Sequence, residues 1–416
     1  MIWIGAIIVM VTFYAIIKRY ETRMVLLVSG FVMALVSGKI SEAIGAFSAT
    51  MVNNGLVTVI CTVMGFAFAM KLTQCDVHLI RLLAGSLSRF RIILIPGAIL
   101  ITAAINTALP SAAGCAAAVG AILIPTLISA GIHPVIAGSA VLAGTWGSAL
   151  SPGNPHNPFI ANLARVDVMT VIAGHAQAAV AALVVVMAVL TAIAIFRKED
   201  RGYSSLQTNI GLEDFKINYL KAIVPIVPLA LLIVGSKQIH LIPEVTVPQV
   251  MLFGTILSFV VTRVNPQEIS KQFFTGMGEA YGSIIGIIIA AAVFTKGMEL
   301  IGLTGALIEA MKHSENIARL AATFGPFIVA VLSGSGDAAT LAFNGAITPH
   351  AEQFGFGISQ MGSQALLSGG MGRSMSPVAG AAIVCAQLAG VNTIELAKRN
   401  APGMILATIV TMLILT

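Results

Sequence analysis

The chain has 416 residues, of which 57% are hydrophobic and only 10% are charged, and it carries a net charge of +6. Soluble domains contain about a quarter charged residues, so the composition excludes an ordinary soluble protein. No Asp, Glu, Lys or Arg occurs between Arg91 and Arg165, a run far longer than the roughly 20 residues that cross a bilayer once. Because such runs lack the alternating polarity of a transmembrane β-barrel, the sequence predicts an all-α polytopic membrane protein.

In chain order, ten apolar runs predict transmembrane helices near 2–17, 24–38, 56–72, 134–158, 168–196, 218–235, 246–262, 281–301, 361–384 and 398–416. The first run lacks a preceding basic region and a following cleavage site, which favours a retained helix over a signal peptide.

Two longer apolar regions, 92–130 and 316–350, are interrupted by small and polar residues: NTALPSAAG at 106–114 and SGSGDAA at 333–339. Each could contain a full span with a shorter one, or a re-entrant hairpin of two half-length helices. With hairpins and the N-terminus outside, 16 of the 23 Lys and Arg residues fall in inside loops and five in outside loops. This distribution obeys the positive-inside rule and favours the hairpins.

The two halves of the chain resemble each other at a shift of about 225 residues. GSALSP at 147–152 aligns with GRSMSP at 372–377, and Val166-Asp167 aligns with Val391-Asn392. Five crossings and one hairpin in each half would leave the second half inverted relative to the first. We therefore expect a first inverted repeat at 1–200, a cytoplasmic linker at 201–217 and a second inverted repeat at 218–416, which is a plan typical of secondary transporters.

Helix breaks are expected at both hairpin tips and in two further runs, 147–157 and 369–380. Backbone groups freed at such breaks are tolerated within a membrane where they line a wet cavity. The N-termini of half-helices also carry partial positive charge, which suits a carboxylate. The sequence thus predicts an anion site at the midplane, with helix breaks at Gly114, Pro152, Gly336, Gly372 and Pro377.

Arg373 lies within one of these breaks, where a central arginine costs roughly 2.5–3.5 kcal/mol on insertion scales. It could bond freed carbonyl groups or extend to the membrane surface. We favour a second interpretation, in which its planar guanidinium binds a substrate carboxylate through two N–H groups. Ser374 and Ser376 could add hydroxyl donors, or bond back to helix carbonyls.

Other polar residues at the breaks have two interpretations each. Asp337 could cap the second half-helix of its hairpin, carry a proton or sodium ion, or pair with Arg373. His156 could be a satisfied polar residue or a second ion-coupling residue. The remaining candidates for substrate binding, which could also be caps or structural polar residues, are Ser111, Ser151, Asn154, Asn157, Ser333 and Ser335.

Several classes of function are disfavoured. The four cysteines lie far apart without a CxxC motif, so neither a disulfide framework nor a metal site is predicted. The basic residues lie in short loops, where membrane insertion explains them better than nucleic-acid binding. No HExxH motif or protease-type arrangement indicates an enzyme, and a passive channel would need an open multi-site pore.

Two C-terminal stretches, SGSGDAA at 333–339 and GRSMSPVAGAAIVCAQLAGVNTIELAKRNAP at 372–402, resemble the signature of the DcuC family of anaerobic C4-dicarboxylate carriers, in the ion transporter superfamily. Gly372, Arg373, Ser374, Ser376 and Pro377 match its Gly-Arg-small-x-Ser-Pro run. Ser333 to Gly336 match its hairpin tip. Asp337 stands where the family would have Asn, and SPGNPHN at 151–157 also departs from the family pattern.

The resemblance implies a secondary active carrier of succinate, fumarate or malate in a bacterial inner membrane, with a dimeric, elevator-type architecture. The expected partners are a dicarboxylate and the lipid bilayer, with no cofactor and with Na+ or H+ as the coupling ion. The two departures leave open the ion and the organic anion. The alternatives are a sodium/proton exchanger, or a carrier of citrate or an acidic amino acid.

Overall fold

The computed structural model describes residues 1–18, 20–87, 93–203, 216–236, 239–312 and 315–415. All regular elements in these ranges are helical, which confirms the predicted all-α class. Most of the predicted linker, at 204–215, and residue 92 of the first predicted hairpin lie outside the described residues.

The first half of the chain contains α1 (Ile2–Ile17), α2 (Thr22–Val36), α3 (Ile40–Met51), α4 (Asn54–Thr73), α5 (Cys75–Leu87), α6 (Leu94–Ala108), α7 (Ala112–Ser129), α8 (Pro134–Gly144), η2 (Gly147–Leu150), α9 (His156–Ala164) and α10 (Val168–Phe196). The second half contains α11 (Tyr219–Ile223), α12 (Val227–Val234), α13 (Val247–Thr262), α14 (Pro266–Ala280), η3 (Tyr281–Ile285), α15 (Gly286–Leu300), α16 (Leu303–Lys312), α17 (Glu315–Ser333), α18 (Gly336–Ala346), η4 (Thr348–Phe354), α19 (Ile358–Ser374), α20 (Gly380–Ala389) and α21 (Thr393–Leu415).

Several of these helices are suited to a membrane. Among the described residues, four continuous helical stretches are long and apolar enough to cross it alone: 54–73, 112–129, 168–196 and 266–300. The pair α20 and α21, bent by 116° between them, also meets this test when taken together. The protein is therefore a multi-pass membrane protein, as its composition predicts.

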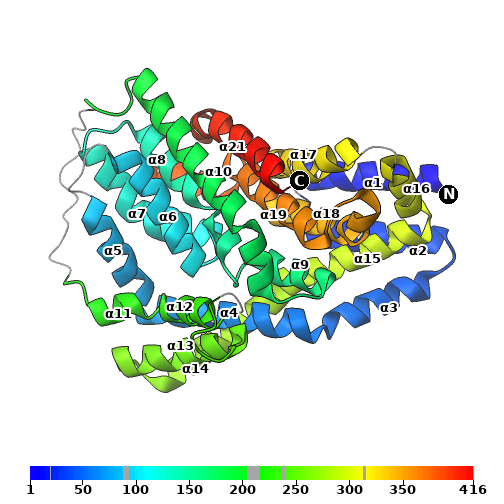
Figure 1. Cartoon of the computed structure of the whole chain (residues 1–416), viewed down its shortest axis with the longest axis horizontal. Coiled ribbons are helices and arrows are strands. Elements are labelled where there is room, and N and C mark those ends of the chain that lie inside the picture. Colours follow the sequence, from blue (N-terminus) through cyan, green and yellow to red (C-terminus); the bar gives the residue numbers. More distant parts are fainter. Residues whose placement is uncertain (19, 88–92, 204–215, 237–238, 313–314, 416) are drawn as a thin grey trace.

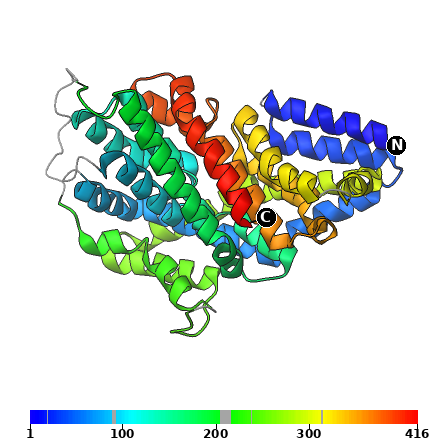
Figure 2. The ribbon, with the colours of Figure 1, turned by 45° about the horizontal axis from the view of Figure 1, so that its top comes forward.

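The long helices α10 and α21 pack side by side across the middle of the molecule (Figures 1 and 2). Helices α5 to α8 lie at one end of the long axis, and α1, α2 and α16 lie at the other (Figure 1). One apolar core joins α6 to α10 with α17 and α19 to α21. A second core joins α1, α2, α4 and α15 to the inner face of α18.

Both regions with polar tips form helical hairpins, but their arms are unequal. The first consists of α6 with 15 residues and α7 with 18, and the second of α17 with 19 residues and α18 with 11. The expectation of two half-length arms is therefore wrong for α7, which is long and apolar enough to cross the membrane alone. At about 1.5 Å per residue, its 18 residues are nearly as long as the hydrocarbon core is thick.

Both predicted broken helices are interrupted. In the run 134–158, α8 ends at Gly144, the short helix η2 follows, and α9 then begins at His156 and continues to Ala164. The run 361–384 consists of α19, which ends at Ser374, and α20, which begins at Gly380 and extends to Ala389.

The predicted spans omit some helices, and some spans contain more than one helix. The helices α3, α5, α14 and α16 fall outside the predicted spans because Asp, Glu, Lys or Arg interrupt their apolar runs. The predicted span at 218–235 is divided into α11 and α12, near Pro225 and Pro228. The predicted span at 281–301 begins with a π-turn that continues α14 into α15.

The order of elements recurs along the chain. The helices α2 and α13 begin 225 positions apart, at Thr22 and Val247, and so do α10 and α21. Packing recurs as well, because α4 contacts α13 and α14 whereas α15 contacts α2 and α3. A Cβ atom built at Gly147 would lie 2.4 Å from the carbonyl oxygen of Ala103 in the first hairpin, and one at Gly372 would lie 2.4 Å from that of Phe327 in the second.

Candidate functional site

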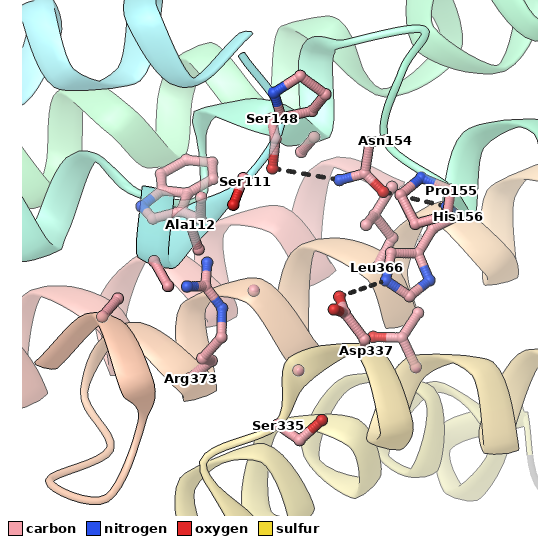
Figure 3. Close-up of a pocket in the computed structure, with 18 of the residues that line it drawn as sticks. Ser111, Ala112, Ser148, Asn154, Pro155, His156, Ser335, Asp337, Leu366 and Arg373 are labelled. Carbon is pink, nitrogen blue, oxygen red and sulfur yellow. Dashed lines mark hydrogen bonds and ion pairs between the residues drawn. The ribbon is translucent and has the colours of Figure 1, made fainter. Parts of the chain in front are cut away.

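A cavity of about 330 Å³ lies between both hairpin tips and both helix breaks (Figure 3). The first residues of four helices line it, together with the residues just before them: 111–113 at α7, 155–156 at α9, 335–337 at α18 and 380–381 at α20. Each helix N-terminus carries roughly half a positive charge with unsatisfied N–H groups. The folding of the breaks therefore creates a positively polarised cavity.

The two tip serines cap their helices. Ser111 Oγ accepts a hydrogen bond from Gly114 N at 3.2 Å, and Ser335 Oγ accepts one from Ala338 N at the same distance. Both residues also line the cavity. Because each hydroxyl oxygen acts as the acceptor in the cap, its own hydrogen remains available for a ligand.

Arg373 reaches the cavity from the end of α19. Its Nη2 donates to the carbonyl oxygen of Thr145 at 2.9 Å, just beyond the end of α8, while its Nη1 is buried without a hydrogen-bond partner. The guanidinium is directed toward Ser111 and Ala112 (Figure 3). One side of the arginine thus satisfies a freed carbonyl, as one interpretation expected, and its Nη1 has no hydrogen-bond partner.

Asp337 faces the cavity opposite Arg373 and pairs with His156. Asp337 Oδ1 lies 2.9 Å from His156 Nε2 (Figure 3). The side chain of Asp337 is 67% exposed, because it lines the cavity, whereas that of His156 is 3% exposed. The cap of α18 is Ser335, so the capping role considered for Asp337 belongs to its neighbour.

Asn154 lines the cavity between the two halves of the first break. Its Nδ2 donates to Ser148 Oγ at 3.3 Å, and its Oδ1 accepts from the backbone N of His156 at 3.0 Å. Ser148 is itself held by Asn106 of the first hairpin, whose Oδ1 accepts from Ser148 N at 2.7 Å. The break and the hairpin are therefore tied together beside the cavity.

Five predicted ligand residues do not line the cavity and are hydrogen-bonded elsewhere. Ser374 Oγ donates to Gly370 O and Ser333 Oγ to Val329 O, both at i−4, at 3.0 and 2.7 Å. Ser376 Oγ donates to Val331 O of the second hairpin at 2.6 Å. Ser151 Oγ accepts from Gly153 N at 3.2 Å.

Asn157 is the fifth of these residues. Its Nδ2 donates to the carbonyl oxygens of Ala149 and Ser151, both at 2.8 Å, so it closes the first break on itself. Of the predicted helix-breaking residues, Pro152 and Pro377 lie between helices, and Gly336 is the first residue of α18 and lines the cavity. The prediction of a break is wrong for Gly114 and Gly372, which lie inside α7 and α19.

Sequence reasoning missed three polar lining residues, Trp146, Ser148 and Thr340. The first two lie at the start of the first break, and the third lies one helical turn beyond Asp337. It also missed His175 of α10, which is fully buried and bonds Ser363 Oγ and Ala149 O, both at 3.0 Å. A histidine inside an otherwise apolar span was the available signal.

The fold and the cavity together define a multi-pass helical membrane protein with a polarised internal cavity. The family model described as "C4-dicarboxylate anaerobic carrier" matches residues 1–416, and the chain belongs to this family, DcuC.

Known relatives agree with this membership. The chain is 38% identical over 271 residues to an uncharacterized transporter of Haemophilus influenzae, across 62% of this chain and 97% of that protein. It is 23% identical to the anaerobic C4-dicarboxylate transporter DcuC of Escherichia coli K12, across 98% of this chain and 94% of that one.

Solved structures with a similar fold are also transporters. One is MtrF of Neisseria gonorrhoeae, described as one of a class of antimetabolite efflux pumps, with a TM-score of 0.62 and 12% identity, covering 90% of this chain and 83% of that one. Another is the YdaH transporter of Alcanivorax borkumensis, with a TM-score of 0.61 and 13% identity, covering 89% and 86%. At these identities the likeness establishes the fold alone.

Proposed function

We propose that the protein is a secondary active transporter of small dicarboxylate anions, such as succinate, fumarate and malate, in a bacterial inner membrane. One observation carries this proposal: a partner-free nitrogen of Arg373 and the first turns of four helices meet at one cavity. Every one of these groups favours negative charge. Family membership supports a C4-dicarboxylate as the substrate class.

The size of the cavity fits such a substrate. Its volume of about 330 Å³ lies near the lower limit for ligand pockets, which span roughly 300–1,000 Å³. A dicarboxylate would place one carboxylate against Arg373 and the Ser111 tip. The second would lie toward the first turns of the other helices. No covalent chemistry is involved.

Alternating access would follow from the repeated architecture. The recurring helix starts, the exchanged packing of α4 and α15, and the paired contacts of Gly147 and Gly372 support two inverted repeats. We propose that α6 to α10, α17 and α19 to α21, which share one apolar core, carry the cavity together with α18 past the remaining helices in an elevator-type movement. A homodimer is part of this proposal.

The test is counterflow of labelled succinate into proteoliposomes. We expect Arg373→Ala to abolish uptake and Arg373→Lys to reduce it more than about tenfold, because lysine keeps the charge but lacks the planar pair of donors. Arg263→Lys, at an exposed helix end away from the cavity, is the matched control and should transport as the wild type does. Normal uptake by Arg373→Ala would contradict the proposed site.

The His156–Asp337 pair supports a second candidate, a sodium/proton exchanger without an organic substrate. Such a protein would move protons against sodium in liposomes that contain no carboxylate. Among organic anions, citrate and acidic amino acids are the competing substrates. A thermal-shift panel distinguishes them, because a ligand that binds only the folded state raises its stability.

A further inference from the structure

Three side chains that carry charge or titrate line the described part of the cavity: Arg373 from α19, His156 from α9 and Asp337 from α18. With His156 neutral, the positive charge of Arg373 and the negative charge of Asp337 cancel. A dianion would then bring two uncompensated negative charges into a partly desolvated site. The carboxylate of Asp337 therefore opposes binding of a dianion unless its charge is neutralised.

The geometry of the His156–Asp337 pair allows such neutralisation. The imidazole and the carboxylate are 2.9 Å apart, the carboxylate is open to the cavity, and the two residues come from different halves of the chain. His156 Nδ1 is buried without a partner, so within the described part of the chain the ring is held to Asp337 alone, through Nε2. The pair thus holds a donor and an acceptor in contact, and its carboxylate can be reached by a proton from the cavity.

The surroundings contain few other titratable groups. The remaining lining residues carry no titratable side chain: apart from Asn154 and Trp146 they are apolar, glycine or hydroxyl-bearing. Cys115 of α7 lies near Arg373 but is buried behind the wall, with its Sγ donating to Thr102 O. His175 is engaged on both ring nitrogens outside the cavity.

We propose that the His156–Asp337 pair binds one proton together with the dianion, so that transport is proton symport. This inference rests on the proposed function and specifies its coupling ion. The proton would come from water on the side where the dianion enters and leave with it on the other side. Protonation changes the net charge of the site by +1, and by linkage the dianion strengthens proton binding by the same factor as the proton strengthens anion binding.

Sodium fits this pair less well. Hard cations select oxygen ligands, whereas the side-chain partner of Asp337 is an imidazole nitrogen that already bonds one of its oxygens. A proton needs only this donor and acceptor.

The experiment is calorimetric titration of the purified protein with succinate between pH 6 and 8, in two buffers of different ionisation enthalpy. The wild type should take up about one proton per succinate, and its Kd should rise by up to about tenfold per pH unit over the range where the pair loses its proton. Asp337→Asn, which resembles the neutralised carboxyl, should take up almost no proton and bind more tightly than the wild type at pH 8.

Two further variants keep the result interpretable. His156→Gln leaves Asp337 to titrate alone, so proton uptake should move to lower pH. Glu279→Gln, which changes an exposed carboxylate on α14 that does not line the cavity, is the matched control and should keep the wild-type proton uptake.

The outcomes separate the two proposals. Succinate binding without proton uptake, or with a requirement for sodium, would overturn proton coupling and leave the dicarboxylate carrier standing. Proton uptake that persists in both Asp337→Asn and His156→Gln would place the proton elsewhere and also overturn it. Failure of the wild type to bind any dicarboxylate would instead refute the proposed function.

Discussion

Replacing Gly372 with alanine tests the contact that holds the second helix break against its hairpin. A Cβ atom at this position would lie 2.4 Å from the carbonyl oxygen of Phe327 and 3.0 Å from its Cα, where 3.4 Å is an ordinary contact. The obstacle is backbone and cannot rotate away, so α17 and α19 must separate by about 1 Å. We take the upper part of the usual overpacking cost, about 3 kcal/mol. Alanine returns about 1 kcal/mol through its higher helix propensity.

The net destabilisation is therefore about 2 kcal/mol. An unfolding entropy of about 2.1 cal/mol/K per residue makes 1 kcal/mol equivalent to about 1 °C in a chain of this length, so the apparent Tm should fall by about 2 °C. A thiol-reactive dye can report unfolding, because the four free cysteines in the described chain are all buried. Stabilisation by succinate should also weaken, because Arg373 adjoins the displaced residue.

Gly174 provides the control for this experiment. It lies within α10 with no atom within 4 Å of a built Cβ, so Gly174→Ala should raise the apparent Tm by up to about 1 °C. Gly147→Ala, which meets Ala103 in the first half, should behave like Gly372→Ala. An increase in Tm for Gly372→Ala equal to that for Gly174→Ala would refute the close backbone contact.

Two further predictions concern buried polar contacts. Burial would raise the pKa of Glu199. Arg399 opposes this effect, because it donates two hydrogen bonds to the carboxylate, at 2.7 and 3.1 Å, and attracts its negative charge. Together with a second arginine, it holds the pKa of Glu199 below its ordinary value of 4.5. Because the folded-state pKa is lowered, the ion pair contributes its full stability above pH 4.5, and this contribution is lost as the pH falls through the folded-state pKa. Glu199→Gln should therefore lower the apparent Tm at pH 7. In strong acid the variant should differ little from the wild type. His175→Leu removes a donor from Ala149 O and leaves the Ser363 hydroxyl without its partner; it should cost about 1–3 kcal/mol in stability and raise the Kd for succinate. A Tm within 0.5 °C of the wild type would mean that this histidine does not hold the break.

Much of the fold could be predicted because charge-free runs and polar interruptions are strong signals. The hairpin turn at Ser111 and the break before His156 follow from Gly, Pro, Ser and Asn inside apolar sequence. The helix α14 was missed because Glu268 and Lys271 interrupt its apolar residues. Asn265 followed by Pro266, a cap and a first helical residue, was the signal that hydropathy ignored.

The sequence predicted where the candidate site lies better than it predicted which side chains line it. A helix break indicates that its residues lie near a cavity, but not which side chains face it. Ser376 and Asn157 were chosen for their chemistry, and both instead satisfy carbonyls that the breaks release. The pairing of His156 with Asp337 joins residues 181 positions apart, and no local pattern indicates such a contact.

If the two halves are repeats, their equivalent positions at the cavity can be compared residue by residue. Positions about 225 apart face it in pairs: Ser111 with Ser335, Ser148 with Arg373, and His156 with Ala381. The converging helix N-termini belong to both members of the first and third pairs and provide a general attraction for anions. The charged and titratable groups occur in one member alone, so the site is electrically asymmetric although its framework repeats. Selection among anions and ions should therefore lie in Arg373 and in the His156–Asp337 pair, whereas substitutions at the shared helix starts should weaken all substrates alike.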